Sequence, residues 1–207
     1  MSYSSVREQV YLWSRPMVLI VFAHASCASA PARHFAAVET EIAVRVDGRG
    51  YIPESVIWGA QIWTSSIFKP LGIKVIWNEE RRPGAPGYPQ VIAVTVVPFA
   101  PVGKSPEALA SASLSKATIT IFNDRVASAM QSSTKFAPAL LSHVLAHEIA
   151  HVLQAVSRHS ESGILKACWS REDFLLMQQH RLNFTPLDVE LIRVGIGALA
   201  ADQAAVE

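Results

Sequence analysis

The sequence has few charged residues and few cysteines. Only 17% of its 207 residues are Asp, Glu, Lys or Arg, whereas 50% are hydrophobic, and this balance excludes intrinsic disorder for most of the chain. The 18 basic and 17 acidic residues nearly cancel, so no general attraction to nucleic acid or to an anionic membrane is expected. Two cysteines, Cys27 and Cys168, exclude a disulfide framework. Any function must therefore come from a specific site in a folded domain.

The apolar run at 17–23 is too short to cross a bilayer, which needs about 20 residues. Arg7 and Arg15 precede it, and small residues follow it as far as Ala30. This order is typical of a secretory signal peptide, although a buried N-terminal strand would give a similar pattern. We expect residues 1–25 to be an export signal and residues 26–207 to form one domain. The mature protein would then be secreted or periplasmic, without stable insertion in a membrane.

The rest of the chain changes from strand-like to helical patterns. Alternating or β-branched runs predict strands at 38–46, 73–77, 91–97 and 117–122, with loops at 78–90 and 98–107. Helical spacing predicts one helix from Pro53 to about Pro70, a long one at 137–155, and further helices starting near Ser170 and Thr185. The sequence therefore predicts an α+β domain in which a twisted mixed sheet packs on a long helix, with helices at the C-terminal end.

The long helix carries the motif His147-Glu148-Ile149-Ala150-His151. Residues four apart lie about 40° apart around a helix and about 6 Å apart along it, so both imidazoles can reach one metal ion. Zn–N bonds of about 2.0 Å are then attainable. Glu148 projects beside the metal, where it can act as general base towards a zinc-activated water and later pass the proton to the leaving amine.

The third ligand is expected at His159, eight residues after His151. In the metzincin pattern H-E-x-x-H-x-x-G-x-x-H, a glycine turns the chain back towards the metal. Here Gln154 stands at the glycine position and Ser157 at the last histidine position. A slightly longer loop would bring His159 back to the site.

Further elements strengthen a resemblance to zincins. Gly163-Ile164-Leu165 resembles the turn beneath the metal in metzincins, with leucine in place of the usual methionine, and Trp169 precedes an acidic helix start at Glu172. The segment from about residue 144 to 186 resembles a group of small exported bacterial zincin-like proteins. This resemblance implies a zinc-dependent peptidase fold but no particular substrate.

Other readings of these residues remain open. Glu172 or Cys168 could replace or supplement His159 as a zinc ligand. His143 could support the site by a hydrogen bond, although an exposed or capping role is the simpler expectation. Arg158 could hold a substrate, although a solvated loop arginine is the simpler expectation.

These observations predict a zinc-dependent endopeptidase with Zn²⁺ bound by His147, His151 and His159 and with Glu148 as the catalytic residue. Its partner would be a peptide or protein substrate. If the strand at 117–122 forms the edge of the sheet, a peptide could add to it as a further strand. The alternatives are a non-catalytic zinc-binding protein of the same fold and a metal-free helical interaction protein.

Overall fold

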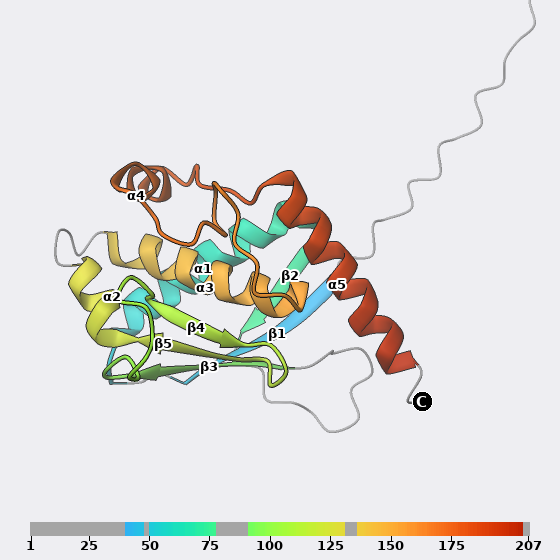
Figure 1. Ribbon diagram of the computed structural model, residues 1–207, viewed down its shortest axis with the longest axis horizontal. Coiled ribbons are helices and arrows are strands. Elements are labelled where there is room, and N and C mark those ends of the chain that lie inside the picture. Colours follow the sequence, from blue (N-terminus) through green and yellow to red (C-terminus); the bar gives the residue numbers. More distant parts are fainter. Residues whose placement is uncertain (1–39, 48–49, 78–90, 131–135, 205–207) are drawn as a thin grey trace, which may run out of the picture. The chain divides into compact units, whose positions relative to one another are not determined.

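The computed structural model describes residues 40–47, 50–77, 91–130 and 136–204. They form a five-stranded sheet with α1 and α3 packed against it (Figure 1). In chain order the elements are β1 (Thr40–Asp47), α1 (Glu54–Phe68), the short 3-10 helix η1 (Lys69–Leu71), β2 (Ile73–Trp77), β3 (Ile92–Val97), β4 (Ala110–Ser113), β5 (Thr118–Phe122), α2 (Asn123–Met130), α3 (Ala137–Gln154), α4 (Arg171–Gln178) and α5 (Pro186–Ala204). The predicted α+β class is confirmed.

Three predictions lie outside the described residues: the export signal at 1–25, the start of the first strand before Thr40, and the loop at 78–90. None of the helices that the structure describes combines the length and the apolar content needed to cross a membrane.

The sheet has the order β2-β1-β3-β5-β4. β4 pairs antiparallel with β5, and the other neighbouring strands are parallel. The strand at 117–122, considered above as a possible sheet edge, is therefore interior, and the edge next to it is β4. The sequence of β4, Ala-Ser-Ala-Ser, contains no β-branched or aromatic residue, so propensity gave no sign of a strand there.

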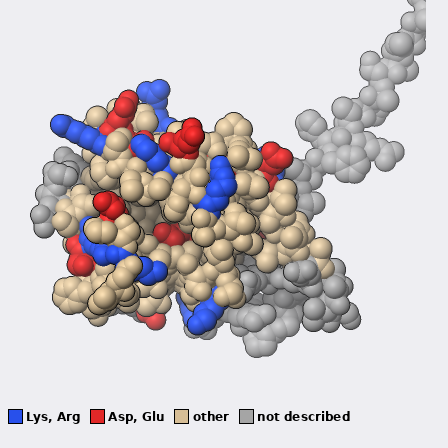
Figure 2. Space-filling model, viewed as in Figure 1, with Lys and Arg blue, Asp and Glu red and all other residues tan. Residues whose placement is uncertain are grey.

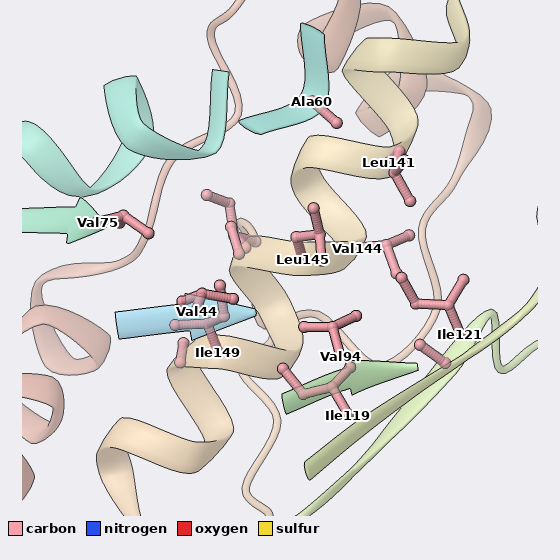
Figure 3. Close-up of a cluster of buried hydrophobic side chains, with 14 of the residues drawn as sticks. Val44, Ala60, Val75, Val94, Ile119, Ile121, Leu141, Val144, Leu145 and Ile149 are labelled. Atoms are coloured by element: carbon pink, nitrogen blue, oxygen red, sulfur yellow. The ribbon is translucent and has the colours of Figure 1, made fainter. Parts of the chain in front are cut away.

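The core lies between the sheet and the helices α1 and α3. Figure 3 shows Val144, Leu145 and Ile149 of α3 near buried side chains of the strands, among them Val44, Val94, Ile119 and Ile121. These aliphatic side chains form one buried cluster, which anchors α3 along the sheet and fixes the position of the motif that the helix carries.

The helix α3 is buried on all sides rather than on one apolar face. Every residue from 137 to 154 except Pro138 is buried. The sheet covers one side, whereas α1, α4 and α5 pack against others. A one-sided periodicity predicted the helix but not this burial, because the covering elements come from distant parts of the chain. His147, Glu148 and His151 consequently lie in a largely dehydrated environment.

Turn and capping residues mark helix ends close to the predicted ones. Gly72 ends η1 with a φ of 76°, a left-handed conformation that suits glycine. Ser170 and Asp173 form a capping box at the start of α4. At the start of α5, the Asp188 carboxylate accepts a hydrogen bond from the backbone N–H of Thr185, and the Asp188 N–H donates to the Thr185 hydroxyl. The helix α2 was not among the predicted elements.

The close packing of α5 on the end of α3 depends on Gly195. A Cβ atom there would lie 1.9 Å from the carbonyl oxygen of Leu153. We expect Gly195→Ala to lower the free energy of unfolding by about 2–4 kcal/mol, because backbone atoms must move apart. Gly197→Ala is the matched control: nothing lies within 4 Å of its Cβ position, and a gain of about 0.5–1 kcal/mol is expected. Urea denaturation of both variants measures the difference, and equal effects would contradict the packing argument.

Candidate metal centre

Three histidines from α3 and the following loop converge on one point. One ligand nitrogen of His147, of His151 and of His159 lies within 4.8 Å of the other two. The Nε2 atoms of His147 and His151 are 3.0 Å apart. The centroid of the His159 ring is 5.3 Å from that of His147 and 5.0 Å from that of His151. The structure thus brings together the three residues that the sequence suggested as ligands.

Hydrogen bonds orient the two imidazoles on the helix. Nδ1 of His147 lies 2.8 Å from the carbonyl oxygen of Ile164, and Nδ1 of His151 lies 3.2 Å from that of Val156. Because a carbonyl oxygen only accepts, each Nδ1 carries the proton and each Nε2 presents a lone pair. Two facing lone pairs repel unless a cation lies between them. This donor set fits zinc, which binds imidazole nitrogen at about 2.0–2.1 Å.

Burial keeps these imidazoles neutral. Desolvation, followed by the repulsion of a positive charge on His151, lowers the pKa of His147 from its ordinary value of 6.5 to about 3. Desolvation also lowers the pKa of His151. Metal ligation requires the unprotonated form of histidine, so both rings are in the form that binds a cation at neutral pH.

The chain returns to the site by a turn that differs from the metzincin pattern. Gln154, at the usual glycine position, is still helical, and its side-chain amide donates to the Asp188 carbonyl oxygen at 3.2 Å. The helix ends one residue later at Ala155, which has the left-handed φ of 53°. The reversal comes one residue later than in the pattern and the return loop is one residue longer, so the third histidine lies two residues beyond the pattern position, at His159.

The turn at 162–165 supports the histidines from the other side. Gly163 has a φ of 78°, and a Cβ there would lie 2.4 Å from the carbonyl oxygen of Asn183. The next residue, Ile164, supplies the carbonyl that orients His147. Leu165 is fully buried, and its carbonyl accepts from the backbone N–H of Ser160 at 2.8 Å. Leucine therefore fills the position that the resemblance assigned to methionine.

Glu148 is a buried carboxyl group in the same cavity as the histidines. Its exposed fraction is 7%. Burial raises its pKa from 4.5 to about 7, against the opposing effects of the Ala112 backbone N–H and the charge of Lys104. A carboxyl group with a pKa close to neutrality can both take up and release a proton, as a general base and acid must.

The cavity has a volume of about 560 Å³ and lies between α3, the edge strand β4 and the segment 157–169. Figure 2 shows a hollow on the face that carries β4, with an acidic residue visible inside it. Much of its wall is apolar, with contributions from Leu109, Leu114, Val144, Trp169 and Phe174. The three histidines therefore face a space large enough for a side chain and its flanking backbone.

Neither rival ligand joins the histidines. Among the described residues, the group that could hold a metal contains the three histidines without Cys168 or Glu172. Cys168 is exposed and lines the cavity, and Glu172 is exposed in the first turn of α4. Neither Cys168 nor Glu172 therefore supplies a ligand on the side of the three histidines that faces the cavity.

Two secondary readings were wrong. His143 is neither exposed nor a cap: it is buried, and its Nδ1 lies 2.7 Å from the Ala139 carbonyl oxygen of its own helix. Arg158 is not simply solvated, because it pairs with the buried Asp188 at 3.0 Å. Nothing in the sequence indicated this ion pair, since the partners are 30 residues apart.

The chain matches no protein-family model and no curated protein. Among solved structures it is similar to archaemetzincin from Methanopyrus kandleri, with a TM-score of 0.50 and 17% sequence identity over 78% of this chain and 98% of that chain. At this identity the similarity shows the fold alone, which is zincin-like. The zincin-like fold that the resemblance implied is therefore confirmed.

Proposed function

We propose that the protein is a zinc-dependent endopeptidase in which His147, His151 and His159 hold the metal and Glu148 is the general base and acid. The observation that carries this proposal is the convergence of three imidazoles within 4.8 Å, beside a buried carboxyl group and facing a cavity. Zinc, when bound, supplies a Lewis acid that lowers the pKa of a coordinated water and polarises a carbonyl group.

The role of Glu148 follows from its position and its pKa. The carboxylate takes the proton of the attacking water and transfers it to the nitrogen of the leaving amine. Burial removes part of the solvation of this carboxyl group and raises its pKa to about 7. The surrounding protein thus supports proton transfer in both directions at neutral pH.

The edge strand β4 offers a binding surface for an extended peptide. The Phe122 N–H donates to the Leu109 carbonyl at 2.9 Å, so these two residues form a hydrogen-bonded pair. In an antiparallel ladder such pairs alternate with non-bonded ones, so Ala110 and Ala112 point their backbone groups away from β5, and the Ala112 N–H already bonds to Glu148. A substrate strand can add to this edge beside Glu148, and the apolar wall of the cavity suits an apolar substrate side chain.

The site of action proposed from the sequence is the periplasm or the medium. It is supported by the charged, apolar and small-residue order of residues 1–25. Comparing the N-terminal residue of the mature protein with Ser26 tests this proposal.

Removing the metal from the purified protein tests the proposed function. We expect about one equivalent of zinc, cleavage of internal bonds in a mixed peptide library, loss of cleavage after chelation and recovery when zinc is restored. One equivalent of zinc without hydrolysis would instead indicate a non-catalytic zinc-binding protein. Zinc far below one equivalent, even after zinc is offered, would contradict both readings.

A further inference from the structure

Asp188 carries a buried charge beside the candidate metal centre. Its side chain is fully buried, although it lies in the first turn of α5. One carboxylate oxygen accepts the N–H of Thr185 at 3.0 Å, as a helix cap. The other carboxylate oxygen makes contacts that the cap does not require.

This second oxygen, Oδ1, holds the residues on either side of the third histidine. Arg158 donates to it at 3.0 Å, and the hydroxyl group of Ser160 also donates to it. Arg158 additionally donates to the Ser160 hydroxyl at 3.2 Å. Both neighbours of His159 are therefore tied to one carboxylate oxygen, which is itself fixed by the start of a helix.

His159 depends on such support more than the other two histidines do. His147 and His151 sit on a buried helix, and carbonyl oxygens orient their rings. His159 is exposed on a loop, and within the part of the chain that the structure describes its ring contacts His147 and His151 without a hydrogen bond. The loop is also one residue longer than in the metzincin pattern, because three residues separate Ala155 from His159, whereas two separate the glycine from the last histidine of the pattern.

We propose that Asp188 is a positioning residue for the third metal ligand: by binding Arg158 and Ser160 it holds the longer return loop so that His159 faces His147 and His151. The proposal rests on the proposed zinc site. The same role of Asp188 explains how the chain can return to the site without the glycine of the metzincin pattern. Gln154 donates to the Asp188 backbone carbonyl, so the end of α3 and the return loop are anchored at the same residue of α5.

Positioning can be separated from the simple effect of charge. The Asp188 carboxylate raises the proton affinity of His147 and His151, so its charge alone would favour a cation at the centre. Arg158→Gln removes a positive charge while it also removes one contact to the loop. A purely electrostatic role predicts tighter zinc binding in this variant, whereas positioning predicts weaker binding.

The test compares zinc dissociation constants, measured by competition with a chromophoric chelator, across four variants. Asp188→Asn should weaken zinc binding about tenfold to a hundredfold, the range observed when groups that orient metal ligands are removed. Ser160→Ala and Arg158→Gln, which leave the helix cap intact, should each weaken binding about threefold to tenfold. Thr185→Val is the matched control: it removes the other half of the cap but no contact to the loop. It should lower the melting temperature and leave zinc affinity within about twofold of the wild type.

Two further readouts keep the result interpretable. The visible absorption spectrum of the Co²⁺-substituted protein should lose intensity in Asp188→Asn but not in Thr185→Val, because ligand loss changes the coordination of cobalt. In the metal-free protein, NMR contacts between the rings of His159 and His151 should weaken in Asp188→Asn.

Zinc affinities and ring contacts like those of the wild type in Asp188→Asn, Ser160→Ala and Arg158→Gln would overturn the positioning role, as would tighter zinc binding in Arg158→Gln. If the wild type binds no zinc, the proposed function fails. The metal-free NMR comparison still decides whether Asp188 positions His159.

Discussion

Glu148→Gln is expected to retain zinc and to reduce peptide hydrolysis by a factor of at least about 10²–10⁴, the usual contribution of a general acid–base residue. The amide has nearly the shape of the carboxylate, so the three imidazoles should keep their arrangement. The amide cannot accept a proton from water, so the variant lacks the carboxyl group whose pKa burial raises to about 7. Peptide cleavage at saturating substrate, with bound zinc measured on the same sample, checks both parts.

Glu107→Gln provides the matched control for this experiment. Glu107 is a second carboxylate that lines the cavity, but it is exposed and accepts a hydrogen bond from Ser105 at 2.8 Å. The same substitution there should change the rate by less than about threefold, because no proton transfer depends on it. Unchanged turnover in Glu148→Gln, or equal losses in the two variants, would contradict the general-base role.

The part of the site that was predictable from the sequence is the part that lies on one helix. The apolar spacing at Leu141, Leu145 and Ile149 predicted α3, and the four-residue spacing of His147 and His151 then required their side chains to lie near each other. Both inferences use only local geometry. His159 is harder to place, because the chain leaves α3 after Gln154 and the loop that leads to His159 has many possible conformations. Its placement was suggested by resemblance as much as by physics.

The supporting structure was not predictable, because it is made of long-range contacts. Asp188 reaches Arg158 across 30 residues, and the backbone of Ala112 approaches Glu148 across 36. The edge strand β4 is a run of alanine and serine that has no strand propensity. It exists because β5 offers it a ladder of backbone hydrogen bonds and because α3 packs beside it.

Burial of the motif was also missed, and it changes the chemistry. A one-sided apolar periodicity implies that the opposite face of α3, which carries the histidines, meets solvent, where ordinary pKa values would apply. In the structure α1, α4 and α5 enclose the helix, and desolvation shifts His147 downward and Glu148 upward in pKa. These opposite shifts leave neutral imidazoles, as metal binding requires, beside a carboxyl group with a pKa near neutrality, as proton transfer requires.

His159→Ala is expected to weaken zinc binding by at least about a hundredfold, more than the loss of a supporting contact causes, because one of three ligands is removed. His147 and His151 remain together on α3, so weak binding should persist. Hydrolysis should fall with zinc occupancy and should not return fully at saturating zinc, since the remaining pair holds the metal differently. Chelator competition and activity measured across a zinc titration give the two quantities.

The rival ligands supply the controls for His159. Glu172→Ala and Cys168→Ser should leave zinc affinity within about twofold of the wild type, because neither residue joins the three histidines. Cys168 lines the cavity, so Cys168→Ser can change peptide affinity while zinc affinity stays constant. If Glu172→Ala or Cys168→Ser released zinc and His159→Ala did not, the loop would have to carry His159 away from the metal in solution. The hydrogen bonds from Arg158 and Ser160 to Asp188 would then hold a loop that takes no part in the metal site.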